Sequence, residues 1–178
     1  MFKVLTEGCE PTRGTKYSAC VDLYSIEDVA IGIGETKVVG LGVAISEEEL
    51  KKIIYENRGK FGLDYHTSFL NTHYLQVALR SSLGKEGLIM PNGVGIIDMD
   101  YRDEIKIIIH NPYKLDPTAY WEMDRDKADE VFRVKNTFTI NKGHRIAQIT
   151  LLEHKSYLFG IESDVIREGG LGSTNTAS

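Results

Sequence analysis

Short runs of apolar and β-branched residues, separated by glycine and turn residues, recur along most of this chain of 178 residues. Isoleucine occupies every second position from Ile105 to Ile109, which is the period of a strand with one buried face. The predicted strands lie at residues 36–45, 96–97, 104–109, 137–140 and 145–152. Many short strands with turns between them predict a mainly β fold, closed or sandwiched as a compact β-barrel or jelly roll.

Two stretches break this β pattern. Ser46 followed by Glu49 forms a capping-box pattern, and apolar residues at helical spacing come after it, so we predict a helix at residues 47–57. Residues 112–133 contain the only tryptophan, Trp121, and a charge-rich run, and we interpret them as an insertion between two strands.

The chain length fits one domain that can bury a core. We therefore expect a single β domain at residues 1–164, with insertions at about 46–74 and 112–133. Residues 165–178 are small, polar and glycine-rich, which predicts a flexible C-terminal arm.

Composition narrows the choice of partners and compartment. The formal net charge of -5 argues against a dedicated DNA or RNA binder, and no apolar run approaches the roughly 20 residues that span a bilayer. The N-terminus has no signal-peptide pattern, so we expect a cytoplasmic protein without membrane contact. Cys9 and Cys20 have no zinc-site spacing, and we expect both thiols to be reduced.

Residues 92–102 hold a turn, an apolar run, two acids and a tyrosine. The Asn92-Gly93 dipeptide predicts a type I′ hairpin turn, and the following isoleucines predict a strand. Asp98 would emerge at the end of that strand, with Tyr101 close behind. The segment therefore predicts a pocket for a small ligand.

Five short motifs, spread in order along the chain, resemble those of the trimeric deoxyuridine triphosphatases (dUTPases), in a phage-like form with two insertions. The motifs are ACVDLYS at 19–25, RSSLG at 80–84, NGVGIIDMDYRDEI at 92–105, KGHRIAQ at 142–148 and GGLGST at 169–174. The resemblance implies a compact β-barrel or jelly-roll dUTPase fold with short helical insertions. It also implies hydrolysis of dUTP to dUMP and pyrophosphate with Mg²⁺.

The third motif would hold the base, the sugar and the attacking water. A carboxylate at a strand end can accept a proton from water or orient it, and the resemblance assigns this role to Asp98. Tyr101 would pack against the deoxyribose and exclude a 2′-hydroxyl. Asn92, Gly93 and Gly95 would read the uracil edge through a hairpin whose glycines permit close approach.

The remaining motifs would hold the triphosphate and its metal. Arg80, Ser81 and Ser82 would bind phosphate oxygens, because guanidinium groups and hydroxyls donate to them. Asp22 and Gln148 would contact Mg²⁺ through water, since a triphosphate-bound Mg²⁺ keeps several waters. Gln148 would also contact the substrate.

The C-terminal arm would close over the phosphates and the base. The resemblance assigns this role to Arg167, Leu171, Gly172, Ser173 and Thr174, and it implies a homotrimer in which one copy's arm covers a site shared by the other two. This chain departs from the family pattern at several motif positions. The departures are Cys20 for glycine, Leu79 for proline, His144 for an acid and Leu171 for an aromatic residue. In addition, Arg167 lies one position closer to Leu171 than the family pattern has it.

Two other functions remain open. A dCTP deaminase, or a combined deaminase and dUTPase, shares the Arg-Ser-Ser motif but usually lacks the acid and tyrosine pattern of Asp98 to Tyr101. Alternatively, the insertions could bind a regulatory protein partner, with the nucleotide site acting as a switch. Tyr113, Tyr120 and Trp121 would be its aromatic anchors.

Overall fold

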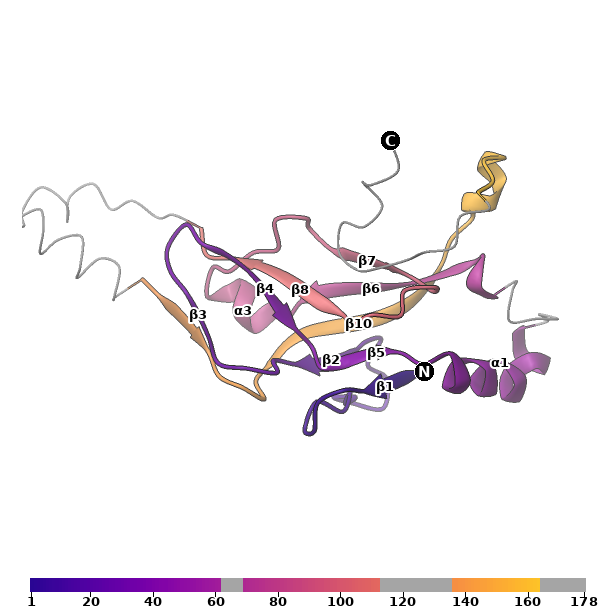
Figure 1. Cartoon of the computed structure of the whole chain (residues 1–178), viewed down its shortest axis with the longest axis horizontal. Coiled ribbons are helices and arrows are strands. Elements are labelled where there is room, and N and C mark those ends of the chain that lie inside the picture. The colour runs from indigo at the N-terminus through magenta and orange to yellow at the C-terminus, as the bar shows by residue number, and fades with distance from the viewer. Residues whose placement is uncertain (62–68, 113–135, 164–178) are drawn as a thin grey trace, which may run out of the picture.

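A computed structural model describes residues 1–61, 69–112 and 136–163 (Figure 1). The strands in this part are β1 (Phe2–Val4), β2 (Val21–Tyr24), β3 (Val29–Ile31), β4 (Thr36–Gly40), β5 (Val43–Ile45), β6 (His73–Leu79), β7 (Gly95–Asp98), β8 (Lys106–His110), β9 (Phe138–Ile140) and β10 (Arg145–Glu153). The helices are α1 (Glu47–Phe61), α3 (Ser81–Lys85) and the 3-10 helix η1 (Ser156–Phe159). The predicted mainly β class is confirmed.

The strands pair only in antiparallel fashion within the described residues. The largest sheet has the order β2-β10-β6-β7, and the pairs β1-β5, β3-β9 and β4-β8 form two-stranded sheets. None of these described sheets closes on itself, so their strand pairing does not form the closed barrel that we expected. The four-stranded sheet crosses the middle of the molecule in Figure 1 and carries the candidate site residues discussed below.

The core confirms the predicted strand faces. Ile105, Ile107 and Ile109 are fully buried, as their alternation predicts. The run at 36–45 is two strands rather than one, since β4 pairs with β8 and β5 pairs with β1. The break lies at Gly42, whose φ is 66°. A left-handed residue cannot continue a strand, so the chain changes partner there.

Helix α1 begins where the capping box predicts it and ends four residues later than predicted, at Phe61. The Ser46 hydroxyl accepts a hydrogen bond from the Glu49 backbone N–H at 3.2 Å, which caps the first turn. Leu50 and Ile54 are buried, so the apolar stripe faces the β domain. Figure 1 shows α1 beside the N-terminus, and the Ser46 N–H donates to the Met1 carbonyl at 2.9 Å.

Several predictions concern the chain outside the described residues or are not tested by the fold. The insertion at 112–133, with Tyr113, Tyr120 and Trp121, lies almost wholly outside the described residues, and so does the arm at 165–178. The division into a domain at 1–164 and an arm remains a prediction. Cys9 and Cys20 are free thiols, and burial raises the pKa of the Cys9 thiol.

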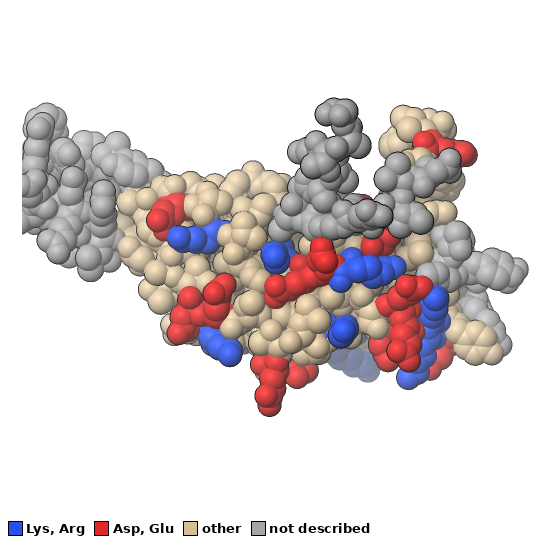
Figure 2. All heavy atoms as spheres, viewed as in Figure 1, with Lys and Arg blue, Asp and Glu red and all other residues tan. Residues whose placement is uncertain are grey.

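The surface of the described part carries charges of both signs. Figure 2 shows acidic and basic side chains close together over the face that it draws. No helix among the described residues is long and apolar enough to cross a membrane.

The break at Gly42 generates a stability prediction. A Cβ atom at this position would lie 2.7 Å from the Cys9 Cβ, whereas a Cβ at Gly8, whose φ is 81°, would meet nothing within 4 Å. Gly8→Ala should cost about 1–2 kcal/mol for the left-handed backbone alone. Gly42→Ala should cost about 1–3 kcal/mol more, because it also overpacks the core. Urea unfolding of both variants measures the difference, and equal losses would contradict the packing argument.

Candidate active site

One face of the four-stranded sheet packs into the core and the other, here called the outer face, points away from it. Leu23, Ala147, Val77 and Ile149 alternate onto the core face and are buried. The residues between them therefore point to the outer face. The predicted site residues on this face are Asp22, Gln148 and Asp98.

Asp22 and Gln148 are cross-strand neighbours. Gln148 lies directly opposite Asp22 on β2 and opposite Ala78 on β6. Two residues from separate predicted motifs thus lie side by side on the edge strand β2 and its neighbour β10, as a shared site requires. Residues opposite each other in an antiparallel pair have Cβ atoms about 5 Å apart, so both side chains can contact one ligand or one hydrated ion.

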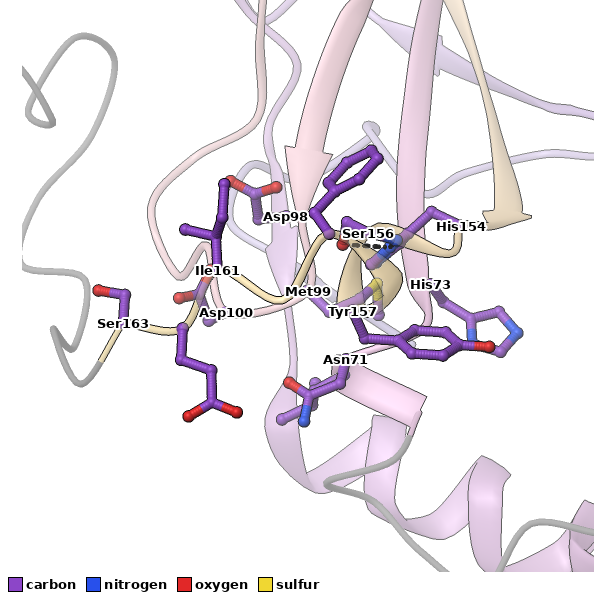
Figure 3. A pocket seen from close by; sticks show the side chains of 13 residues that line it. Asn71, His73, Asp98, Met99, Asp100, His154, Ser156, Tyr157, Ile161 and Ser163 are labelled. Atoms are coloured by element: carbon purple, nitrogen blue, oxygen red, sulfur yellow. Dashed lines mark hydrogen bonds between the residues drawn. The ribbon is translucent and has the colours of Figure 1, made fainter.

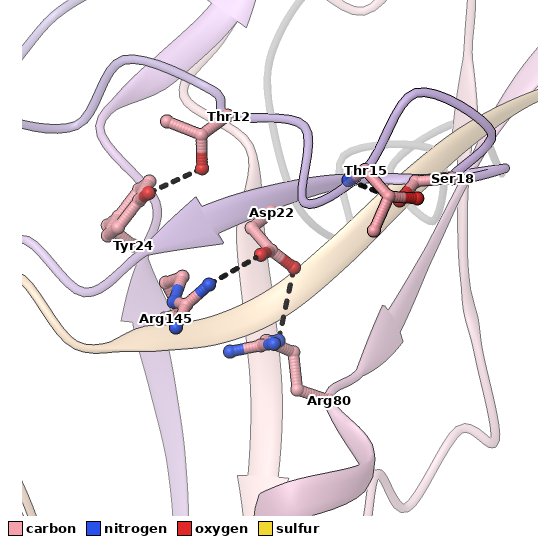
Figure 4. A network of polar contacts seen from close by, with 7 residues as sticks. All are labelled: Thr12, Thr15, Ser18, Asp22, Tyr24, Arg80 and Arg145. Carbon is pink, nitrogen blue, oxygen red and sulfur yellow. Dashed lines mark hydrogen bonds and ion pairs between the residues drawn. The ribbon is translucent and has the colours of Figure 1, made fainter.

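The Asp22 carboxylate is held between two arginines (Figure 4). Arg80 Nε lies 3.1 Å from Asp22 Oδ1, and Arg145 Nη1 lies 3.3 Å from Asp22 Oδ2. The Asp22 side chain is only 12% exposed, while those of Arg80 and Arg145 are 27% and 50% exposed. Each guanidinium has five N–H donors, so both retain donors that can face an anion.

A bulge in β10 brings Arg145 to the outer face. The register shifts between Arg145 and Ala147, so that Ile146 is an extra residue on this strand. Without it, Arg145 and Gln148 would point to opposite faces, because side chains alternate. The Ile146 carbonyl accepts a hydrogen bond from the Arg80 backbone N–H at 3.0 Å, which ties the two arginine positions together.

Arg145 was not among the residues predicted for the site. The fourth motif contains it, but its spacing from Gln148 suggests the opposite face of a regular strand. Its place in that motif and its charge, which is opposite to that of Asp22, are the signals that could have found it.

The predicted phosphate residues Ser81 and Ser82 follow Arg80 in the first turn of α3 and are exposed. The Arg80 carbonyl accepts hydrogen bonds from the Leu83 and Gly84 N–H groups, which makes a tight turn at the end of β6. Leu83 is buried and anchors that turn. Arg80, Ser81 and Ser82 therefore share one corner of the sheet.

The turn before β7 differs from the prediction. The Gly93 N–H donates to the Met90 carbonyl at 2.9 Å, so Pro91 and Asn92 are its central residues. The predicted type I′ turn at Asn92-Gly93 is therefore wrong, and proline favours the observed position because its fixed φ suits the first central residue. Gly93 does have a positive φ of 71°.

The predicted hairpin at residues 92–95 is also not what the structure shows. Strand β7 begins at Gly95 and pairs with β6 rather than with the segment before the turn, whose Ile89 bridges to His110. Asp98 ends β7, as predicted, and lies opposite Tyr74.

Asp98 lines a pocket of about 860 Å³ (Figure 3). The figure shows Asp98 and Ile161 at one end of this pocket and His73 with Tyr157 at the other. The lining also includes Asp100 and His154 but none of Asn92, Gly93, Gly95 or Tyr101. The size suits a small ligand, and Asp98 has the accessible position that contact with water requires.

Tyr101 lies in the hydrophobic core and is 6% exposed. Its hydroxyl donates a hydrogen bond to the Glu104 carbonyl at 3.1 Å. In a single chain, therefore, only a small part of this side chain can contact a ligand.

One chain does not bring Asp98 to the arginine cluster. Asp98 lies opposite position 74 on β6, and Arg80 follows that strand six positions farther along, so roughly 20 Å separates them at about 3.3 Å per residue. Gln148 lies opposite position 78, roughly 13 Å along the sheet and about two strand spacings across it from Asp98. The predicted residues thus form two clusters at different ends of the outer face.

The donors near Asp22 fit indirect contact with a metal better than direct coordination. The described residues contain no group of three or more His, Cys, Asp or Glu side chains placed to hold an ion. Asp22 and Gln148 offer only a few oxygens, which suits a Mg²⁺ that keeps its waters and is carried by a phosphate ligand. The predicted arm residues Arg167, Leu171, Gly172, Ser173 and Thr174 lie outside the described residues.

Known structures share this fold. The dUTPase from phage phi11 of S. aureus superposes with a TM-score of 0.59 at 21% identity, over 96% of this chain and 97% of that one. The dUTPase from Streptococcus mutans gives 0.53 at 21% identity, over 85% of this chain and 94% of that one. At these identities the likeness shows the fold alone.

Sequence relatives go further, although no family model matches the chain. The deoxyuridine 5′-triphosphate nucleotidohydrolase of Rickettsia canadensis is 29% identical over 94% of this chain and 88% of its own length. The enzyme of the same name from Nautilia profundicola is 32% identical over 177 residues, which are 97% of this chain and 94% of that relative. Since this likeness spans nearly the whole of both proteins, the chain belongs to the deoxyuridine 5′-triphosphate nucleotidohydrolase family, the dUTPases.

Proposed function

We propose that this protein hydrolyses dUTP to dUMP and pyrophosphate. Membership of the dUTPase family supports the reaction, and the observation that carries the site is the Asp22 carboxylate held between Arg80 and Arg145. This cluster has two positive charges and one negative charge beside the exposed hydroxyls of Ser81 and Ser82. Such a set of donors suits the oxygens of a triphosphate.

Arg80, Ser81 and Ser82 would donate to the phosphates, and Arg145 extends this set from the neighbouring strand. Asp22 and Gln148 would hold a phosphate-bound Mg²⁺ through its waters. When bound, Mg²⁺ would neutralise part of the charge on the phosphates. Asp22 would also orient the two arginines, because it contacts both.

Asp98 would orient the attacking water and accept its proton, with attack at the α-phosphorus. Its place at the end of β7, on the wall of a pocket, supports this role. Asn92, Gly93 and Gly95 would contact the uracil through the turn before β7. Tyr101 would exclude ribose through the small part of its ring that reaches the surface.

The complete site would lie between copies of the chain. A general base must lie within hydrogen-bond reach of the water that it activates, and that water must reach the phosphorus. Roughly 20 Å between Asp98 and Arg80 is too far for this within one chain. We therefore propose that Asp98 of one copy meets the arginine cluster of another in a homotrimer. Arg167, Leu171, Gly172, Ser173 and Thr174 of a third copy would close over it.

A pyrophosphate-release assay with dUTP, dTTP, dCTP and UTP, with and without Mg²⁺, tests the reaction and its selectivity. Release from dUTP alone supports the proposal. Ammonia released from dCTP would instead indicate a deaminase or a combined enzyme.

Asp98 and Asp100 make a matched pair for the catalytic role, since both are exposed carboxylates on the wall of one pocket. Asp98→Asn should lower kcat at least about a hundredfold, because the amide cannot accept the proton, while dUTP binding changes little. Asp100→Asn should retain turnover within a few-fold. Steady-state kinetics and binding of a non-hydrolysable dUTP analogue measure both effects, and normal turnover by Asp98→Asn would remove the residue from its role.

The shared site predicts complementation between two defective variants. Arg80→Ala and Asp98→Asn should each be nearly inactive alone. When both are co-expressed in equal amounts, a site works if its Asp98 comes from one variant and its Arg80 from the other. The chance is one half times one half, so about a quarter of wild-type activity should return. Co-expression without recovery would show that both residues act within the same chain or not at all.

A further inference from the structure

Two hydroxyl groups lie beside the arginine cluster and take no part in the roles described so far. The hydroxyls of Thr12 and Tyr24 are hydrogen-bonded to each other at 2.5 Å (Figure 4). Thr12 and Asp22 form a backbone bridge: the Asp22 N–H donates to the Thr12 carbonyl at 2.7 Å, and the Thr12 N–H donates to the Asp22 carbonyl at 3.2 Å. Thr12 therefore continues the sheet beyond β2 and points to the outer face with Asp22.

Tyr24 is the direct cross-strand neighbour of Arg145. Residues in such a pair have Cβ atoms about 5 Å apart, and the diagonal neighbour is within reach of a long side chain. Arg145 uses that diagonal to reach Asp22, two positions along β2 from Tyr24. Its path across the outer face therefore starts beside the tyrosine.

The Arg145 side chain is less constrained than that of Arg80, so a neighbour that restricts its rotamers matters more for Arg145. Its side chain is 50% exposed, against 27% for Arg80, and its contact with Asp22 is the longer of the two. A long exposed side chain loses considerable rotamer entropy when a ligand orders it. A neighbour that restricts those rotamers in advance reduces the loss.

We propose that the Thr12–Tyr24 hydroxyl pair is a positioning element that directs Arg145 toward Asp22 and the phosphates. The hydrogen bond to Thr12 fixes the Tyr24 ring, and the fixed ring limits the directions open to the arginine. This inference rests on the proposed function, since it assigns Arg145 to the binding of a pyrophosphate-containing anion. It concerns affinity rather than the chemical step, because neither hydroxyl need touch the substrate.

A purely structural role would have a different signature. Thr12 is exposed and Tyr24 is half-buried, so water can replace the lost partner when either hydroxyl is removed. Tyr24→Phe retains the ring and Thr12→Val retains the shape. Both variants should therefore fold, and their melting temperatures should change little.

A double-mutant cycle tests whether Tyr24 acts through Arg145. The measurements are KM and kcat for dUTP, and the Kd for pyrophosphate with Mg²⁺, in Tyr24→Phe, Arg145→Ala and the double variant. Tyr24→Phe alone should raise KM and Kd roughly two- to tenfold, the range for loss of one hydrogen bond, with kcat nearly unchanged. In the Arg145→Ala background it should have no further effect.

Thr12→Val should reproduce the effect of Tyr24→Phe, and the two together should do no more than either alone. Thr15→Val is the matched control, because Thr15 lies in the same loop and its hydroxyl bonds to Ser18 instead (Figure 4). That control should leave KM and Kd unchanged.

Equal effects of Tyr24→Phe in both backgrounds would overturn the proposal, as would a lowered melting temperature with KM and Kd unchanged. If the wild-type protein releases no pyrophosphate from dUTP, the proposed function fails. The cycle on the Kd for pyrophosphate still decides whether the hydroxyl pair positions Arg145.

Discussion

The Asp22 carboxylate joins three chain segments into one cluster on the outer face. It contacts Arg145 on β10 and Arg80 at the end of β6, and it lies on β2 itself. Without this negative charge, two guanidinium groups would face each other in a partly buried place, which costs free energy. With it, the cluster retains one net positive charge, and both guanidinium groups keep N–H donors that do not bind Asp22. The ion pairs therefore hold three chain segments together, and in the proposed function they also prepare a surface for the phosphates.

The β10 bulge shows where prediction from sequence reaches its limit. The strand at 145–152 and the buried isoleucines from Ile105 to Ile109 follow from periodicity, which depends only on neighbouring residues. The bulge at Ile146 depends on pairing with β2, more than 100 positions earlier in the chain, and no local pattern signals it. Pairing has the same non-local origin at β7, because this strand finds its partner in β6 and not in the segment before it, although Pro91 is a local signal for the turn itself.

The motifs identify the candidate site residues but do not say which chain supplies them. Asp22, Arg80 and Gln148 come together in one chain because β2, β10 and the end of β6 are neighbours. Asp98 carries an equally clear motif and lies far from them, because its register on β6 places it near the other end of that strand. Tyr101 is buried by the packing of the loop between β7 and β8, and a motif cannot report such packing.

The same outer face carries both clusters, and this limits how copies of the chain can meet. In the proposed homotrimer, a second copy brings its arginine cluster to the Asp98 end of the first, so two different parts of the surface form each contact. Exposed Ile96, with half-buried Tyr74 and Leu152 on that face, supplies apolar area beside Asp98. Contacts between unlike surfaces close into rings when the rotation between copies permits it. A cyclic trimer satisfies this condition, since each copy then gives Asp98 to one neighbour and receives it from the other.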